Sequence, residues 1–163
     1  MIEKKYMRQA IKQAMKAYEK DEVPIGCVIV KDDKIIARGY NLRQSKQQSY
    51  AHAEMIAIQK ACKKLNSWRL EDCELYVTLE PCPMCAGAIL QSRIKRVVYG
   101  AKDPKGGCID SCMQMYETKG FNHYPEVLSG VLNDECASLL TNFFKEKRAK
   151  KKQLKMQKLD ETI

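Results

Sequence analysis

Apolar residues recur at helical spacing at two places in the first half of the chain. One set, at separations of 4, 3 and 4, predicts an amphipathic helix near the N-terminus: Met7, Ile11, Ala14 and Tyr18. A second set predicts a helix that begins near His52: Met55, Ile58, Cys62 and Leu65. Between them, the apolar segments 25–30 and 34–39 flank the polar residues 31–33, which predicts a β-hairpin. Residues 41–50 are polar and aperiodic, which predicts a loop.

The second half of the chain alternates short apolar runs with helical patterns. Residues 73–79 predict a strand, which Glu80 and Pro81 end. Residues 82–91 predict a short helix, and residues 95–100 predict the next strand. A strand, a helix and a second strand in this order predict a right-handed parallel crossover.

The last third of the chain begins with an irregular region and ends in a helix. Residues 101–125 predict a loop with a short helix around Met113, and residues 126–131 predict a short strand. Asn133 is a good N-cap for the final helix. The apolar stripe of this helix consists of Cys136, Leu139, Leu140 and Phe143. No apolar stripe continues beyond Lys147, so we expect the tail to be solvated.

These elements form one layered α/β domain, since strands and helices alternate without an internal repeat or a flexible linker. We assign residues 1–148 to this domain and residues 149–163 to a basic C-terminal tail that extends the last helix. The chain has 163 residues, of which 45% are hydrophobic, so it can bury a core and is not a disordered tether.

The sequence shows no targeting or membrane signal. No apolar run approaches the roughly 18 residues that a membrane span requires. Residues 1–16 are charged and lack the continuous apolar stretch of a signal peptide. We therefore expect a cytoplasmic protein without a membrane partner, in which the eight cysteines are reduced thiols.

The positive charge is concentrated near the C-terminus. The net charge is +9. Residues 145–158 contribute +7 of it, because this segment contains eight basic residues and only one acidic residue, Glu146. These residues are Lys145, Lys147, Arg148, Lys150, Lys151, Lys152, Lys155 and Lys158. A concentrated basic segment beside a nearly neutral body indicates a polyanionic partner.

Three side chains in the middle of the chain predict a metal site. Cys82 and Cys85 lie three residues apart at a predicted helix start, where free backbone amides and the helix dipole favour the thiolate form. His52 begins the preceding helix, and both helix starts follow sheet elements, which can bring them to the same edge of the sheet. Three ligands leave one position for water, as in catalytic zinc sites. We therefore expect one zinc ion, although other soft cations also accept these ligands.

Glu54 adds an acid–base group to this set. It lies two residues after His52, too far round a helix to bind the same metal ion, yet it can carry a proton between a water molecule and a departing nitrogen. Alternatives remain at this point, because a CxxC pair alone is also typical of a redox pair or half of a structural zinc site. A fourth ligand such as Cys62 or Cys73 would close the site, although their positions favour packing.

The combination His52-Ala53-Glu54 and Pro81-Cys82-Pro83-Met84-Cys85 resembles the signature of the zinc-dependent nucleoside and nucleobase deaminases. Within this group the chain resembles the bacterial tRNA-specific adenosine deaminases over nearly its whole length. The similar segments include Glu22-Val23-Pro24-Ile25-Gly26, Gly39-Tyr40-Asn41, Gly100-Ala101-Lys102-Asp103-Pro104-Lys105 and Asp134-Glu135-Cys136-Ala137. The zinc motif marks the superfamily, and the later segments mark the tRNA branch.

The resemblance implies a fold, a cofactor and a reaction. The fold is a three-layer α/β/α arrangement with a central mixed sheet of about five strands. His52, Cys82 and Cys85 would hold zinc, and Glu54 would shuttle protons. The reaction implied is the hydrolytic conversion of adenosine to inosine at the wobble position of an arginine tRNA. The implied partner is the tRNA anticodon stem-loop, and the implied assembly is a homodimer.

Four further residues match substrate-contacting positions of that family. Asn41 matches an asparagine that contacts the extruded nucleoside, and Asp103 matches an aspartate that contacts the neighbouring ribose. Phe144 and Arg148 match positions in the last helix that approach RNA. Considered without the family, Asn41 and Asp103 are also typical turn-forming residues, and Phe144 also suits core packing.

Two other functions remain open from the sequence. A deaminase of free guanine, cytosine or a nucleoside would share the zinc chemistry but would need no basic tail. A non-catalytic, zinc-stabilised RNA-binding module would need the tail but not Glu54. The replacement of Glu54 by Gln and the truncation of the tail therefore distinguish the three hypotheses.

Overall fold

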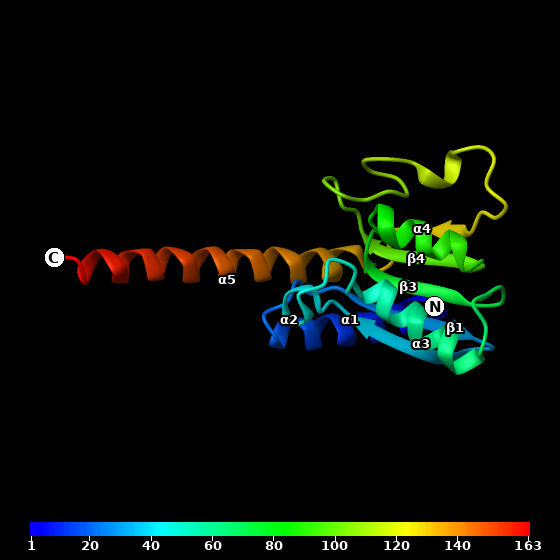
Figure 1. Cartoon of the computed structure of the whole chain (residues 1–163), viewed down its shortest axis with the longest axis horizontal. Coiled ribbons are helices and arrows are strands. Elements are labelled where there is room, and N and C mark those ends of the chain that lie inside the picture. Colours follow the sequence, from blue (N-terminus) through cyan, green and yellow to red (C-terminus); the bar gives the residue numbers. More distant parts are fainter.

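The computed structural model describes all residues from Met1 to Ile163 and contains a five-stranded mixed sheet covered by helices on both faces (Figure 1). The strands, in the spatial order β2-β1-β3-β4-β5, are β1 (Gly26–Lys31), β2 (Lys34–Tyr40), β3 (Glu74–Leu79), β4 (Arg96–Ala101) and β5 (Glu126–Leu128). β1 is antiparallel to both β2 and β3, whereas β3, β4 and β5 are mutually parallel. This arrangement confirms the predicted three-layer α/β/α fold.

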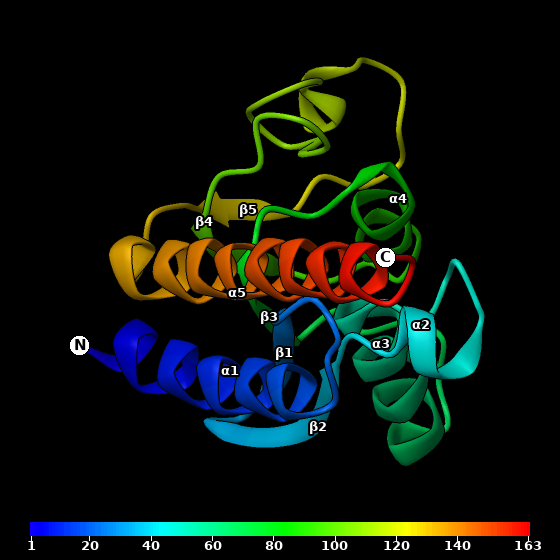
Figure 2. The same cartoon turned by 90° about the vertical axis from the view of Figure 1, so that its left-hand side faces the viewer.

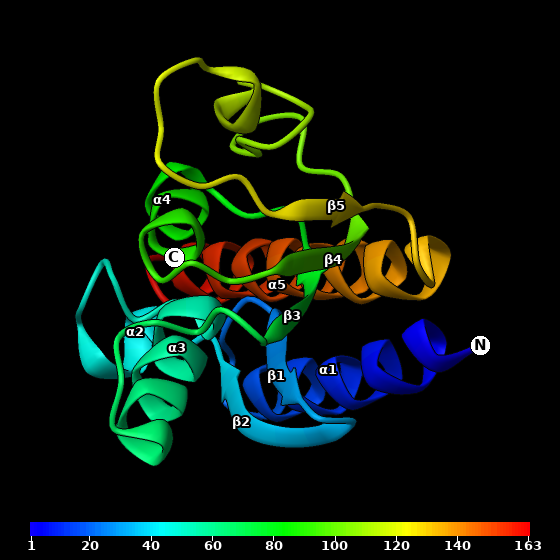
Figure 3. The ribbon, with the colours of Figure 1, turned by 90° about the vertical axis from the view of Figure 1, so that its right-hand side faces the viewer.

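The helices divide between the two faces of the sheet. They are α1 (Ile2–Glu19), α2 (Arg43–Lys46), α3 (Ala53–Leu65), α4 (Pro83–Gln91) and α5 (Asn133–Asp160), with a short 3₁₀ helix at Met115–Glu117. Figure 2 shows α1 and α5 side by side on one face, and Figure 3 shows α3 and α4 on the other. None of the helices combines the length and hydrophobicity that crossing a membrane requires.

Strand alternation explains the two apolar layers. Cys27 and Ile29 of β1 face α3 and α4, whereas Val28 and Val30 face α1. Successive side chains of a strand point to opposite faces, so a strand covered on both faces is apolar at every position. The predicted hairpin is present, with Gly26 paired with Tyr40 at its open end.

Gly26 lets β1 and α1 pack unusually close together. A Cβ atom at this position would lie 2.0 Å from the carbonyl oxygen of Ala10 and 2.4 Å from the amide nitrogen of Ala14. No side chain fits at such distances, so only glycine allows this approach. The close packing fixes the middle of α1 against the start of β1, at the edge of the sheet where the candidate site lies.

Two local predictions are wrong. Asn133 is the first residue of α5 rather than its N-cap, because Leu132 occupies the cap position in a left-handed conformation with a φ of 53°. The segment predicted as a loop contains the single helical turn α2, whose amides at Gln44 and Ser45 donate to the buried carboxylate of Glu22 at 3.0 and 2.8 Å. This cap comes from a residue far away in the sequence, so local patterns do not reveal it.

The last helix is longer than its apolar stripe. α5 continues to Asp160, well past the buried Phe143, and residues 149–163 are all exposed. In Figure 1 this part of α5 projects away from the sheet as a single straight rod. The division of the chain at residue 148 stays a prediction, since α5 crosses this point without a break.

Candidate active site

Two helix starts bring the three predicted metal ligands together. His52 precedes the first residue of α3, Cys82 precedes the first residue of α4, and Cys85 lies in the first turn of α4. The Nδ1 atom of His52 is 3.6 Å from the sulfur of Cys82 and 3.5 Å from that of Cys85. In a tetrahedral zinc site with Zn–N of about 2.05 Å and Zn–S of about 2.3 Å, nitrogen and sulfur lie about 3.6 Å apart. The spacing of these donors therefore fits a tetrahedral metal ion.

The electrostatics of α4 favour metal binding. Hydrogen bonding from Cys85, together with His52, lowers the pKa of Cys82 to about 4, so Cys82 is a thiolate at neutral pH. The free amides at the start of α4 act in the same direction. Cys62 and Cys73 pack in the core cluster around α3 and do not join the metal-ligating group. The arrangement therefore provides three protein ligands and no fourth cysteine.

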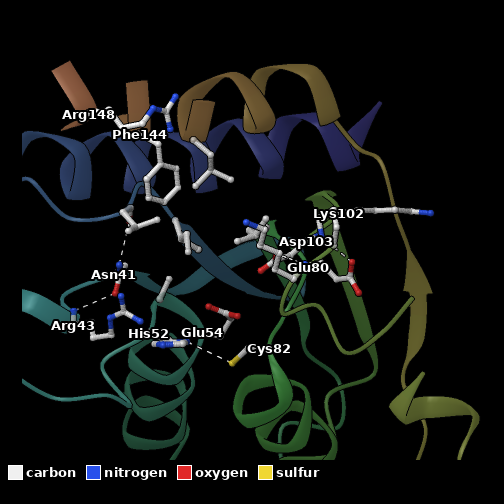
Figure 4. A pocket seen from close by; sticks show the side chains of 17 residues that line it. Asn41, Arg43, His52, Glu54, Glu80, Cys82, Lys102, Asp103, Phe144 and Arg148 are labelled. Carbon is white, nitrogen blue, oxygen red and sulfur yellow. Dashed lines mark hydrogen bonds between the residues drawn. The ribbon is translucent and has the colours of Figure 1, made fainter. Parts of the chain in front are cut away.

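Glu54 lies beside these ligands in the first turn of α3. Its side chain is only 4% exposed, and burial raises its pKa to about 7. Figure 4 shows its carboxylate between His52 and Cys82, directed into the open space of the pocket. A buried carboxyl group at this place can both accept and release a proton near neutral pH.

A pocket of about 640 Å³ opens above this cluster (Figure 4). Seven of the eight predicted site residues line it: Asn41, His52, Glu54, Cys82, Asp103, Phe144 and Arg148. The eighth, Cys85, is fully buried behind the pocket floor. Residues from four distant parts of the sequence thus meet at one edge of the sheet.

Asn41 binds the backbone of two neighbouring segments and also lines the pocket. Its amide nitrogen donates to the carbonyl of Val23 at 3.2 Å, and its amide oxygen accepts from the backbone of Arg43 at 3.1 Å. A side-chain amide has two N–H groups and two lone pairs, so one of each remains for a ligand. Asn41 therefore shapes the loop after β2 and still presents polar groups to the pocket that it lines.

The two neighbouring aromatic residues of α5 have different environments. Phe143 is buried and packs edge-to-face against Tyr18 of α1, with ring centroids 5.5 Å apart. Phe144 is 42% exposed and points from α5 toward the pocket in Figure 4. Arg148 lies one turn further along the same face. Phe143 is thus a core residue, whereas Phe144 lines the pocket.

Several lining residues were not predicted. The charged ones are Arg43, Glu80, Lys102 and Lys105. Proximity in sequence could have indicated three of them, because Lys102 and Lys105 flank Asp103, and Arg43 follows Asn41 by two residues. Cations around a concave site raise the local concentration of anionic ligands.

Comparisons with known proteins agree with this geometry. The family model of the MafB19-like deaminases matches residues 1–148. The tRNA-specific adenosine deaminase of Bacillus subtilis (strain 168) is 58% identical over 147 residues, which cover 90% of this chain and 91% of that protein. The chain belongs to the tRNA-specific adenosine deaminase family. A second member of this family, from Streptococcus pyogenes serotype M1, is 46% identical over 90% of this chain and 86% of its own length.

Solved structures of two kinds of deaminase resemble this chain. A structure from a study of A-to-I editing by tRNA:A34 deaminases at the wobble position of transfer RNA has a TM-score of 0.81 and 45% identity. It covers 83% of this chain and 98% of the compared chain. A guanine deaminase from Bacillus subtilis has 44% identity but a TM-score of 0.58, over 60% of this chain and 63% of its own. The deaminase with the tRNA substrate is the better match in both extent and geometry.

Proposed function

We propose that this protein is a zinc-dependent hydrolase that converts adenosine to inosine at the wobble position of tRNA, with an arginine tRNA anticodon stem-loop as substrate. The observation that carries the proposal is the cluster of His52, Cys82 and Cys85 beside the buried carboxyl of Glu54, at the floor of an accessible pocket. Family membership supports the reaction, and the cations that line the pocket support a nucleic acid as the substrate.

His52, Cys82 and Cys85 would hold the zinc ion. When bound there, zinc would supply Lewis-acid activation of a water molecule at neutral pH. The spacing of the three donors supports zinc, and the absence of a fourth cysteine supports a catalytic rather than a structural site.

Glu54 would move the protons of the reaction. It takes a proton from the water molecule that attacks carbon 6 of adenine and delivers it to the adjacent ring nitrogen. It then takes the remaining proton from the new hydroxyl group on carbon 6 and transfers it to the amino group, which leaves as ammonia while the C=O bond of inosine forms. The burial of Glu54 supports this role, because a pKa near 7 lets one carboxyl group act as base and then as acid.

The pocket walls would hold the extruded nucleotide and its neighbours. Asn41 offers its free amide groups to the nucleoside, and Asp103 accepts a hydrogen bond from the adjacent ribose hydroxyl, a contact that favours RNA over DNA. Phe144 stacks on a base, and Arg148 contacts a phosphate. The unpaired nucleotides of an anticodon loop make extrusion of the base inexpensive.

The charges around the pocket support a nucleic acid rather than a free base. Arg43, Lys105 and Arg148 line the pocket, and none of them forms an ion pair. A neutral purine base gains nothing from these cations, whereas the phosphates of an anticodon loop do. The exposed basic residues of the tail extend the same surface. The similarity to a guanine deaminase nevertheless makes free guanine the second candidate substrate.

One assay tests the proposal. Purified protein is incubated with anticodon stem-loops that carry A, C or G at the wobble position and, separately, with free adenosine, guanine and cytosine. We expect inosine only from the stem-loop with A, and no product from any substrate with the Glu54→Gln protein. Turnover of free guanine with an inert stem-loop would overturn the proposal in favour of a base deaminase.

Location and assembly complete the proposal. We propose that the protein acts in the cytoplasm, where tRNA takes part in translation. We also propose that it is a homodimer, because the family resemblance implies one. Light scattering on the purified protein tests the assembly, and a monomer that retains full activity would contradict it.

A further inference from the structure

A single buried carboxylate organises the segment that follows β4. Glu80 comes directly after β3 and is 2% exposed. Its Oε2 atom accepts hydrogen bonds from the backbone amides of Ile109, Asp110 and Ser111, at 3.1, 2.9 and 3.0 Å. Its Oε1 atom accepts from the backbone amide of Asp103 at 3.2 Å and from the hydroxyl of Ser111. The two oxygens thus hold the two ends of the segment 103–111.

The segment closes tightly around this carboxylate. A Cβ atom at Gly107 would lie 2.3 Å from the carboxyl carbon of Glu80, so no larger residue fits there without displacing the carboxylate. The amide of Gly107 donates to the carbonyl of Asp103, and the amide of Cys108 donates to the carbonyl of Pro81, each at 2.9 Å. The backbone of the segment 103–111 therefore folds around the carboxylate of Glu80.

This loop is also a wall of the pocket. Glu80 and Asp103 both line the pocket, and Figure 4 shows them together on the side opposite Asn41. Glu80 precedes the metal ligand Cys82 by two residues, so it connects the strand that leads to the pocket floor with the loop that forms the wall. The hydrogen bond from the amide of Asp103 to this side chain therefore helps to set the position of Asp103 relative to the metal ligands.

We propose that Glu80 is a positioning residue that holds Asp103 at the place where it receives the substrate ribose. The inference rests on the proposed function, since it assumes that Asp103 contacts RNA. It goes beyond that function because Glu80 has no contact with the reacting atoms and acts only through the loop that it binds. Fixing a binding group in advance removes the cost of ordering it when the substrate arrives.

The substitution Glu80→Gln separates the two ends of the segment. Glutamine has one acceptor oxygen and one NH₂ group of nearly the same size. If its oxygen accepts from the three amides at 109–111, its NH₂ group faces the N–H of Asp103, where two donors oppose each other. The hydroxyl of Ser111 can rotate and accept instead. The variant therefore keeps one end of the segment anchored and releases Asp103.

A double-mutant cycle tests the inference. We would measure kcat and KM for the wobble-A stem-loop, together with zinc content and melting temperature. The proteins are wild type, Glu80→Gln, Asp103→Ala and the double variant. We expect each single variant to raise KM about tenfold, because each loses about one hydrogen bond to a charged group. The zinc content should stay that of the wild type. The double variant should have the KM of Asp103→Ala alone.

Glu22→Gln is the matched control. Glu22 is also a buried carboxylate that accepts two backbone amides, but it holds α2 on another side of the pocket. A loss of stability alone would affect Glu80→Gln and Glu22→Gln alike, and both effects would add to that of Asp103→Ala. The inference requires that only the effect of Glu80→Gln disappears in the Asp103→Ala background.

Gly107→Ala provides a second route if Glu80→Gln does not fold. It displaces the carboxylate from within the loop and leaves the strand intact. Its effect on KM should also disappear in the Asp103→Ala background. A wild-type KM for Asp103→Ala, or an additive double variant, overturns the inference while the deaminase activity of the wild type stands. Absence of inosine formation by the wild type instead overturns the proposed function.

Discussion

We expect one side of the basic part of α5 to contact the substrate. The contribution of the lysines on that side can be measured separately from the effect of the total charge of the tail. Leu140, Phe144 and Arg148 line the pocket at intervals of four residues. At about 100° per residue, Lys151, Lys155 and Lys158 lie within about 40° of the direction of Phe144. They extend the pocket wall along the projecting helix for about 15 Å beyond Arg148. We predict that these three lysines contact phosphates of the anticodon stem.

The size of the effect follows from counterion release. Each phosphate contact with a duplex contributes about 0.9 to the slope of log K against log salt concentration. Replacement of all three lysines by alanine should therefore lower the slope by about 2.7. Between 50 and 200 mM salt, this difference changes the ratio of the two dissociation constants about 40-fold. The wild type should bind more tightly at low salt, and the two proteins should converge as salt rises.

Fluorescence anisotropy with a labelled anticodon stem-loop measures these slopes. The control protein carries Lys145→Ala, Lys150→Ala and Lys152→Ala, which removes the same charge from positions about 80° or more away from Phe144. We expect the control to keep nearly the wild-type slope. Equal slopes for the two triple variants would show that the tail acts only through its total charge. An unchanged slope in both would refute any contact between tail and stem.

The other predictions concern the floor and the walls of the pocket. Glu54→Gln should lower kcat by a factor of about 10² to 10⁴ and keep its zinc, whereas a non-catalytic module would lose nothing. His52→Ala should lose zinc in elemental analysis and melt at a lower temperature. Asn41→Ala should weaken turnover with zinc retained, and wild-type kinetics would disprove its role. Hydrogen bonds from Ser45 and Gln44 outweigh burial and hold the pKa of Glu22 below its ordinary value. Its stabilising contribution is therefore complete at pH 7 and lost as pH falls, so the stability difference between wild type and Glu22→Gln should narrow from pH 7 to pH 4.

Periodicity was sufficient for the central strands and for the longer helices that pack on them. The strands in the middle of the sheet read as apolar runs, and α1 and α3 read as stripes, because local burial imposes a repeat on the sequence. The candidate metal ligands were predictable from the spacing of a few residue types. Cys82 and Cys85 lie within one helical turn, and this spacing is typical of a metal site or a redox pair. The match of His52 and Glu54 to the same signature completed the set.

The parts that sequence reasoning missed depend on long-range backbone contacts. Nothing near residues 43–46 predicts a helical turn, because its cap is supplied by Glu22. Nothing near Glu80 shows that its partners lie 23 to 31 residues later in the chain. A glutamate before a proline reads only as the end of a strand. In both cases most of the donors are backbone amides, which leave no residue type to recognise.

These two carboxylates also explain why the pocket rim remains cationic. Glu80 lines the pocket, and Glu22 binds the helical turn α2, which contributes Arg43 to the lining. Both carboxylates accept hydrogen bonds from backbone amides rather than from the nearby basic side chains. The ion pairs of the structure lie elsewhere and join Arg69 to Glu71 and Arg96 to Glu3 and Glu74. Because the buried anions are satisfied by the main chain, the cations that line the pocket keep their charge available for a phosphate. The same acidic residues that shape the walls therefore do not compete with the nucleic acid for its contacts.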